Sequence, residues 1–505
     1  MLLLWVVYCL LVVAGHGRSG GEVQALLDAG KDVALEPGEV VELAATLEVK
    51  RTGTKIYTTG ATSASDFATI RHMDGAVGML INAHGVAGVV LEDLILDGNR
   101  PGFRHPEGKL EYEPMLSLGG VGADGQVVRR CIVVNSRSAG GWGAIHAQEG
   151  ADGIVIEDNI VFACGADIRG NGRSPWEKPF GWGDGISTAS RNTLIRNNLI
   201  VDSTDEGIMV QGGPGTKVQN NLIIALSREM LGGIALIDPF GYFQIEPKES
   251  KRFDYRGVVV EDNRIIAMGS RIHAALPMGG DAWHPTLGET TLVGAIVRNN
   301  LILGRGCGYG YVANGIDEFI IEGNRSEAVY SGLGDGLLNN PPDEPSAYLF
   351  NPDTIGTSKL QPEFRKAQRH VSKVLRTDRG PNIPRDALGY RDLGYPEQEA
   401  NAIVEGAYVE MLGRLPDAEE TNKFSTWLQA THANADALRI QLMATPEFVE
   451  RNGPVNPLDL HKWRGERMTK VFVSTCMQLQ QRNNGQWPDV EKFYEQLKPF
   501  LEFKE

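Results

Sequence analysis

Two acidic residues occupy the same place in neighbouring segments that resemble each other. Asp184 lies in the phrase GDGIS and Glu206 lies in DEGIM, a step of 206 − 184 = 22 residues. If these segments are consecutive coils of a stacked structure, the roughly 4.8 Å between parallel strands brings their carboxyl groups together. Two carboxyl groups ~5 Å apart are the machinery of a retaining glycosidase, and their repulsion raises one pKa as a general acid requires. Asp205 adds a third acid to the same patch.

A structural role is the alternative for these acids. An acid before a glycine is common in turns, where its side chain caps the bend. The two interpretations make different predictions about contacts. Catalytic carboxyl groups converge on one face of the molecule, whereas a turn-forming Asp184 bonds only backbone amides.

The acids belong to a repeat that runs through the middle of the chain. Phrases such as VVVEDNRII and AIVRNNLIL alternate Val, Ile and Leu with other residues, which is typical of short strands with one buried face. The shortest steps are 221 − 198 = 23 and 324 − 300 = 24 residues, and insertions in loops explain the longer ones. An asparagine recurs at one point of these phrases, at Asn159, Asn198, Asn221, Asn263, Asn300 and Asn324. We expect these side chains to point inward and to hydrogen-bond their counterparts in adjacent coils.

This pattern resembles the right-handed parallel β-helix proteins of the pectin-lyase-like superfamily. The resemblance covers about 21–336, and its start, EVQALLDAG followed by strand-like VALEPGEVVEL, is similar to the capping helix and first strands of that family. It implies an all-β right-handed parallel β-helix. The superfamily contains polysaccharide hydrolases, lyases, epimerases and non-catalytic proteins, so the fold does not choose among them.

Two catalytic motifs of the superfamily are incomplete in this sequence. Epimerases and related lyases carry Asp-Pro-His, whereas Asp238 and Pro239 are followed here by Phe240. Polygalacturonase-like hydrolases use paired aspartates and a Gly-His-Gly, and no Gly-His-Gly occurs. The nonapeptide calcium repeat is also missing, so we expect neither a metal nor another cofactor.

Other candidate site residues lie on the outward row of the second strand and in the insertions. His146 is a candidate base on that row, with a solvated surface histidine as the alternative, and Gln211 is a candidate substrate contact. Aromatic rings in long loops suit stacking on sugar rings, although burial that anchors the loop is an equal alternative. The candidate substrate-binding residues of the insertions are Trp176, Trp182, Asp238, Tyr242, Trp283 and His284.

The two ends of the chain differ from the repeat. The apolar stretch 1–14 is shorter than the roughly 20 residues of a spanning helix and favours a signal peptide at 1–20, with an uncleaved anchor as the alternative. We expect a Pro- and Gly-rich linker or strap at 337–397 and a helical domain at 398–505. Cys131, Cys164, Cys307 and Cys476 are too scattered for a disulfide framework and are expected to be buried thiols.

The helical domain resembles a small family of unknown function that recurs at the ends of secreted repeat proteins. Thr445 replaces the usual serine of that family but keeps the N-cap hydroxyl before Pro446. The motif is matched by Tyr408, Leu412, Gly413, Arg414, Pro416, Asp417, Trp427, Thr445, Pro446, Glu447 and Phe448.

Charge narrows the possible partners. With 49 Lys and Arg against 64 Asp and Glu, the formal charge of −15 argues against nucleic acid. The resemblance to the pectin-lyase-like superfamily, together with the apolar N-terminus, implies a secreted, extracellular protein that engages a polysaccharide as a hydrolase or lyase. The alternative is a non-catalytic extracellular structural or carbohydrate-binding surface protein, and the helical domain is a possible site for a protein partner.

Overall fold

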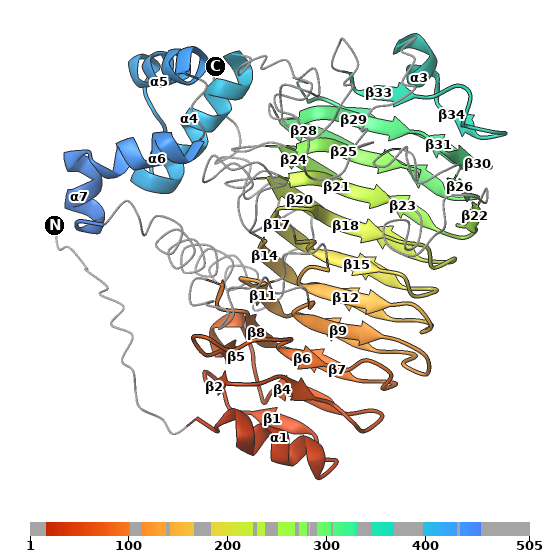
Figure 1. Cartoon of the computed structure of the whole chain (residues 1–505), viewed down its shortest axis with the longest axis vertical. Helices are drawn as coiled ribbons and strands as arrows, with labels where there is room; N and C mark the ends of the chain where they lie inside the picture. Colours follow the sequence, from red (N-terminus) through yellow and green to blue (C-terminus); the bar gives the residue numbers. More distant parts are fainter. Residues whose placement is uncertain are drawn as a thin grey trace, which may run out of the picture.

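The computed structural model describes residues 17–100, 113–137, 142–165, 183–225, 230–237, 251–267, 272–279, 282, 290–304, 307–328, 330, 346–367, 397–431 and 435–455. These residues form a right-handed parallel β-helix and a small helical domain (Figure 1). The fold expected from the repeat is therefore confirmed. Most of the expected signal peptide, residues 1–16, lies outside the described part. Within that part, no helix is long and apolar enough to cross a membrane.

Each coil contributes one strand to each of three long parallel sheets. The first sheet consists of β1 (Val33–Leu35), β4 (Lys55–Thr58), β7 (Val90–Glu92), β10 (Val127–Arg129), β13 (Val155–Glu157), β16 (Leu194–Arg196), β19 (Lys217–Gln219), β23 (Val259–Glu261), β27 (Ile296–Arg298), β31 (Ile320–Glu322) and β34 (Lys359–Leu360). The second consists of β2 (Val40–Leu43), β5 (Ala68–His72), β8 (Leu94–Asp97), β11 (Ile132–Val134), β14 (Ile160–Cys164), β17 (Leu199–Ser203), β20 (Leu222–Ala225), β24 (Arg264–Ala267), β28 (Leu301–Gly304) and β32 (Arg325–Ser326). The third consists of β3 (Leu47–Glu48), β6 (Ile81–Asn82), β9 (Leu116–Gly119), β12 (Ile145–Gln148), β15 (Ile186–Thr188), β18 (Glu206–Val210), β21 (Met230–Leu236), β25 (Ile272–Met278), β29 (Cys307–Ala313) and β33 (Tyr348–Phe350).

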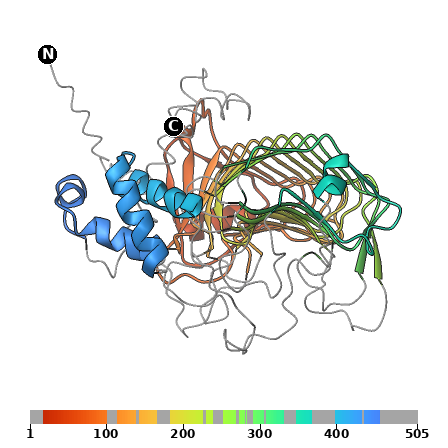
Figure 2. The ribbon, with the colours of Figure 1, turned by 90° about the horizontal axis from the view of Figure 1, so that it is seen from above.

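A short fourth sheet and a few helices complete the described structure. The fourth sheet consists of β22 (Lys251–Asp254), β26 (Thr290–Val293) and β30 (Ile316–Asp317). The helices are α1 (Gly20–Asp28), the 3₁₀ turn η1 (Ala64–Asp66), α3 (Pro362–Ala367), α4 (Glu397–Leu412), α5 (Ala418–Thr431), α6 (Ala435–Met443) and α7 (Pro446–Asn452). Seen along the stack, the coils superimpose, so each sheet continues from one coil to the next (Figure 2).

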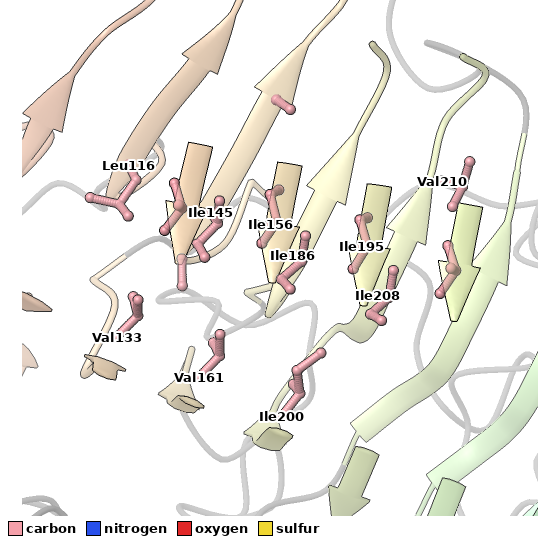
Figure 3. Packing of buried hydrophobic residues seen from close by; sticks show 14 of the residues in the cluster. Leu116, Val133, Ile145, Ile156, Val161, Ile186, Ile195, Ile200, Ile208 and Val210 are labelled. Atoms are coloured by element: carbon pink, nitrogen blue, oxygen red, sulfur yellow. The ribbon is translucent and has the colours of Figure 1, made fainter. Parts of the chain in front are cut away.

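The core lies inside the coils and is built from the aliphatic residues that alternate along each strand. In the third sheet, Ile145, Ile186 and Ile208 are Cα partners in consecutive coils, and all three are fully buried. Figure 3 shows this row facing the matching rows of the other two sheets. Complete burial of one such side chain is worth about 1.5–3 kcal/mol, and this repeated burial holds the stack together.

The asparagine ladder is confirmed. The Nδ2 group of Asn198 donates to Asn221 Oδ1 at 3.0 Å and to the Ile156 carbonyl oxygen at 2.9 Å. Asn221 repeats this pattern with Asn263, and the ladder ends on the Gln361 side chain. The residues just before the ladder asparagines adopt a left-handed conformation that Asn and Asp tolerate. They are Asp158, Asn197, Asn220, Asp262 and Asn299.

The ladder bears directly on the one N-x-Ser/Thr sequon of the sequence, Asn324-Arg325-Ser326. Asn324 is buried, and its Nδ2 group donates to the Val297 carbonyl oxygen at 2.9 Å. A folded chain cannot present this amide for modification. We predict that the protein carries no glycan at Asn324 after expression in a eukaryotic secretory host. A glycopeptide covering Asn324 in a mass-spectrometric map would mean that the ladder ends at Asn300.

Both ends of the β-helix are covered by a helix. Helix α1 begins with a capping box between Ser19 and Glu22 and buries Val23 and Leu27 against the first coil. At the other end Phe364 of α3 lies edge-on to the rings of Tyr348 and Phe350. Covering the ends protects open sheet edges that would otherwise pair with other chains. Since β33 and β34 pair with β29 and β31, the sheets extend past residue 336 into the segment expected as a linker.

The helices α4–α7 form a separate small core. Its largest buried members include Tyr408, Phe424 and Phe448. Arg414 lies over the Tyr408 ring at 5.2 Å and forms ion pairs with Glu420 and Glu447. The Thr445 hydroxyl accepts from the Phe448 amide, which confirms the expected N-cap.

The cysteine prediction is confirmed where it can be examined. Cys131, Cys164 and Cys307 are buried and take part in no disulfide among the described residues. Cys476 lies outside the described residues.

Candidate active site

Asp184, Asp205 and Glu206 converge at the edge of the third sheet. Asp184 directly precedes the Gly185 that leads into β15, and Glu206 is the first residue of β18. The pairing of Ile186 with Ile208 places the two acids side by side. Each of the three carboxyl groups offers an oxygen, and these atoms all lie within 4.8 Å of one another. An upper limit of 4.8 Å is compatible with the ~5 Å between the two carboxyl groups of a retaining glycosidase.

Glycines follow Asp184 and Glu206 where the coils pack closely. A Cβ atom at Gly185 would lie 2.6 Å from the Gly207 carbonyl oxygen and 2.7 Å from Ile200 Cγ2. A Cβ atom at Gly207 would approach the next coil and Ile223 just as closely. These positions therefore leave no room for a side chain, and the tight stacking holds the two acidic residues at the same place in adjacent coils.

The hydrogen bonds around the acids do not match a simple turn. Asp184 Oδ1 accepts from the Glu206 backbone amide at 3.2 Å, as a turn acid would. However, Asp184 Oδ2 and Glu206 Oε2 are buried without a hydrogen-bond partner. Among the described residues, no cationic side chain forms an ion pair with any of the three acids. Leaving carboxyl oxygens unpaired and buried is costly, which marks this cluster as a functional feature.

All three acidic residues are buried in the folded protein. Asp184, Asp205 and Glu206 have relative exposures of 0%, 8% and 2%. Burial is the main cause that raises the pKa of all three carboxyl groups, and the charge of Asp205 further raises the pKa of Asp184 and of Glu206. The Ser187 hydroxyl and the Glu206 amide favour the charged form of Asp184. For Glu206, by contrast, both acidic neighbours favour the protonated form. The environment therefore favours protonated carboxyl groups in this cluster.

These raised pKa values predict a stability change for Glu206→Gln. A carboxyl group whose pKa is raised by folding stabilises the protein below its unfolded value, about 4.3, and that contribution is lost as the pH rises through its folded pKa. Glutamine has the same shape and no charge. We expect the melting temperature of the Glu206→Gln variant to exceed that of the wild type at pH 8. The difference should shrink as the pH is lowered toward 4. Equal melting curves of both proteins at pH 8 would contradict the buried-charge assignment.

His146 is not a solvated residue of the outer face. It is buried, and burial lowers its pKa to about 3. Its Nδ1 atom lies 2.8 Å from Ser187 Oγ, and its ring lies edge-on to Trp142 at 4.5 Å. So weak a base is a poor general base near neutral pH, where proton transfer works best with a matched pKa.

Ser187 is a site residue that the sequence interpretation did not select. It lies three residues after Asp184, and β15 pairs with β12 so that Ser187 faces His146. Both residues lie on the outward row of the repeat, which is the signal that would have connected them.

The remaining predicted site residues are not brought to this cluster. Gln211 follows Glu206 by 211 − 206 = 5 residues, or roughly 16 Å at ~3.3 Å per residue, and its Nε2 contacts Met209. Outside the described residues lie Trp176, Trp182, Asp238, Tyr242, Trp283 and His284.

The same carboxyl groups have a spacing that suits a divalent cation. Calcium takes carboxylate oxygens at about 2.3–2.6 Å, so ligands on opposite sides of the ion are about 4.6–5.2 Å apart. One oxygen from each of Asp184, Asp205 and Glu206 lies within 4.8 Å of the other two, which is close enough for one ion to contact all three. Whether this cluster binds a divalent cation, contrary to the expectation of no metal, is therefore a question for a binding experiment.

Comparison with known proteins adds information about the fold. No known family model matches the chain, and no curated protein matches it by sequence. The endo-xylogalacturonan hydrolase from Aspergillus tubingensis aligns over 71% of this chain and 94% of its own, with 10% identity and a TM-score of 0.42. The exopolygalacturonase from Thermotoga maritima aligns over 61% of this chain and 86% of its own length, with 13% identity and a TM-score of 0.36. A mutant tailspike protein of E. coli bacteriophage HK620 aligns over 62% of this chain and 60% of its own length, with 10% identity and a TM-score of 0.37. These likenesses concern the fold and not the reaction.

Proposed function

We propose that this protein hydrolyses glycosidic bonds of a polysaccharide, with Asp184, Asp205 and Glu206 as its catalytic residues. One observation carries the proposal: three buried carboxyl groups converge within 4.8 Å with no cationic partner among the described residues. Such a cluster retains protons where ordinary carboxyl groups have lost them. A carboxylic acid beside carboxylates is the pair of groups that glycoside hydrolysis requires.

The environments of the three acids assign their roles. Glu206, the member whose neighbours favour protonation, donates its proton to the glycosidic oxygen as the bond to the anomeric carbon breaks. Asp184 and Asp205 are the other two carboxyl groups of the site, and the ionised member stabilises the positive charge that develops on the sugar ring. A water molecule then supplies the hydroxyl group to the anomeric carbon, and its proton passes to a carboxylate, which restores the starting state.

A calcium-dependent lyase is the second candidate, because Asp184, Asp205 and Glu206 are close enough to hold one divalent cation. A bound ion would supply positive charge beside the substrate, and the product of a lyase carries an unsaturated sugar. Both candidates require a polysaccharide as partner. We also propose that the protein acts outside the cell, which the short apolar N-terminus supports.

The proposal is tested by incubating the protein with neutral and acidic polysaccharides, with calcium or with a chelator. We expect new reducing ends without ultraviolet absorbance from unsaturated products, and the same rate with the chelator. Unsaturated products that require calcium would overturn hydrolysis in favour of the lyase. No product from any substrate, together with measurable binding, would favour the non-catalytic carbohydrate-binding alternative.

A further inference from the structure

The second sheet has an apolar outer face, and we propose that the C-terminal segment 456–505 of the same chain packs on it. The inward residues of this sheet, such as Val161 and Ile200, belong to the core of the coils (Figure 3). Since side chains alternate along a strand, the residues on either side of them point outward. They form a second apolar cluster, which includes Ile132, Ile160, Leu199, Val201, Leu222 and Ile224.

The outer face of the first sheet shows how different an uncovered face of the same coils is. Its outward positions carry charged side chains such as Glu157 and Arg196, which form an ion pair. On the second sheet, by contrast, Leu199, Leu222 and Ile224 have relative exposures of only 6%, 1% and 4%. This burial arises within a single chain, so the chain itself must supply the cover.

The connections that flank the second sheet are too short to fold back over it. Two residues connect β17 to β18, and four connect β20 to β21 and β24 to β25. On the other flank, two residues connect β16 to β17, β19 to β20 and β23 to β24. The cover of these coils therefore comes from a more distant part of the chain.

The described apolar residues outside the sheet do not reach most of this face. Those that join the cluster are Ala61, Ala64 and Phe67. Phe67 directly precedes β5, which lies five strand spacings, or roughly 24 Å, from β20. The buried apolar residues of α4–α7 form their own core. The cover of β20 is therefore sought outside the described residues.

The C-terminal segment has the sequence pattern of such a cover. It contains 505 − 455 = 50 residues and follows directly after the small core of α4–α7. Its stretch 466–484 contains neither Gly nor Pro, which favours a helix. Apolar residues recur there at helical spacing and give one apolar side, at Met468, Val471, Phe472, Cys476 and Leu479.

The length of this stretch also matches the face. Its 484 − 465 = 19 residues span roughly 28 Å as a helix. The apolar cluster runs from Ile95 of β8 to Leu303 of β28, across seven strands, or roughly 29 Å at the usual strand spacing. One amphipathic helix laid along the stack would therefore cover the whole row.

Other stretches outside the described residues suit the face less well. The longest internal ones are 166–182, 331–345 and 368–396. Each contains several Gly and Pro residues, which favour turns, and none has an apolar period as long as that of 466–484. The apolar stretch 1–14 is expected to leave with the signal peptide. Packing of 456–505 would tie the helical domain to the β-helix and shield a face that otherwise invites association.

Alkylation of Cys476 with iodoacetamide tests this packing in the full-length protein. We expect Cys476 to react at least about 10-fold more slowly in the native protein than in the denatured chain, because thiol reactivity follows exposure. Leu222→Asp on the sheet and Phe472→Asp on the segment should each restore most of the reactivity, since an unpaired charge is costly to bury. Mass spectrometry locates the label, and unlabelled Cys131 and Cys164 in the core report intact coils.

Lys217→Asp is the matched control. Lys217 is exposed on the first sheet of the coil that contains Leu222, so this variant should leave Cys476 protected. Equal reactivity of Cys476 in the native and the denatured protein would overturn the packing. So would a Cys476 that stays protected in Leu222→Asp while the coils are intact. If Leu222→Asp unfolds the coils, Phe472→Asp decides, because it changes no residue of the β-helix.

The double variant shows whether the segment packs on this face or on another. Denaturation of Leu222→Asp with Phe472→Asp should reveal no larger loss of stability than the larger single loss, because an undocked segment has no contact left to break. Losses that add up would place the segment elsewhere. The molecular mass in solution should remain that of a monomer. A dimer whose dissociation exposes Cys476 would mean that the segment covers a second copy, and would overturn packing within one chain.

Discussion

Glu206→Gln is expected to lower turnover by about 10²–10⁴-fold, the usual contribution of a general acid. Glutamine keeps the shape of the side chain and cannot donate a proton to the leaving oxygen. The loss should appear in kcat, measured as reducing ends released from the best polysaccharide of the panel. The variant should be folded and at least as stable as the wild type near neutral pH, because a buried acid is replaced by a neutral amide.

The matched control is Glu261→Gln. Glu261 lies on the outer face of the first sheet, where it forms an ion pair with Arg298. The acidic cluster lies in a different sheet, the third. A partly exposed pair of this kind contributes little to stability, so the control should keep full activity. If Glu206→Gln and Glu261→Gln have equal activity, Glu206 is not the general acid.

Asn221→Leu is expected to destabilise the β-helix by about 2–5 kcal/mol. The Asn221 side chain accepts from both the backbone amide and the Nδ2 group of Asn198, and it donates to the Ile195 carbonyl oxygen and to Asn263. Leucine leaves two buried donors of Asn198 without this acceptor, at about 1–3 kcal/mol each. Chemical denaturation followed by circular dichroism measures the effect.

Asn220→Gly provides the control at the adjacent position. Asn220 is exposed and has a φ of 53°, a left-handed conformation that glycine adopts without strain. This change should cost less than about 1 kcal/mol. A loss as large as that of Asn221→Leu would show that the turn conformation, and not the buried amide, provides the stability.

The fold was predictable because its physical determinants repeat in the sequence. The coils repeat the same inward aliphatic residues, and those from Asn159 to Asn324 also repeat one buried asparagine, so one pattern occurs many times in the sequence. Two details were not visible. Gln361, which ends the ladder, lies outside any repeat phrase, and β33 and β34 extend the sheets through a segment rich in turn residues.

The site was predictable only in its position. The 22-residue step brought Asp184 beside Glu206, because register follows from coil length. Burial did not follow from the sequence, since an acid before a glycine reads as a surface turn. The burial of His146 was not predicted for the same reason: outward alternation indicates the face on which a residue lies and not what covers that face.

The proton on Glu206 is the central claim, and infrared difference spectroscopy tests it most directly. Spectra of the wild type at pH 6, where an ordinary glutamate near 4.3 is ionised, are compared with those of Glu206→Gln. We predict a protonated-carboxyl band in the wild type that disappears in the variant and that fades as the pH rises further. A wild type with no such band at pH 6, or a band that Glu206→Gln leaves in place, would contradict the assignment of Glu206 as the proton donor.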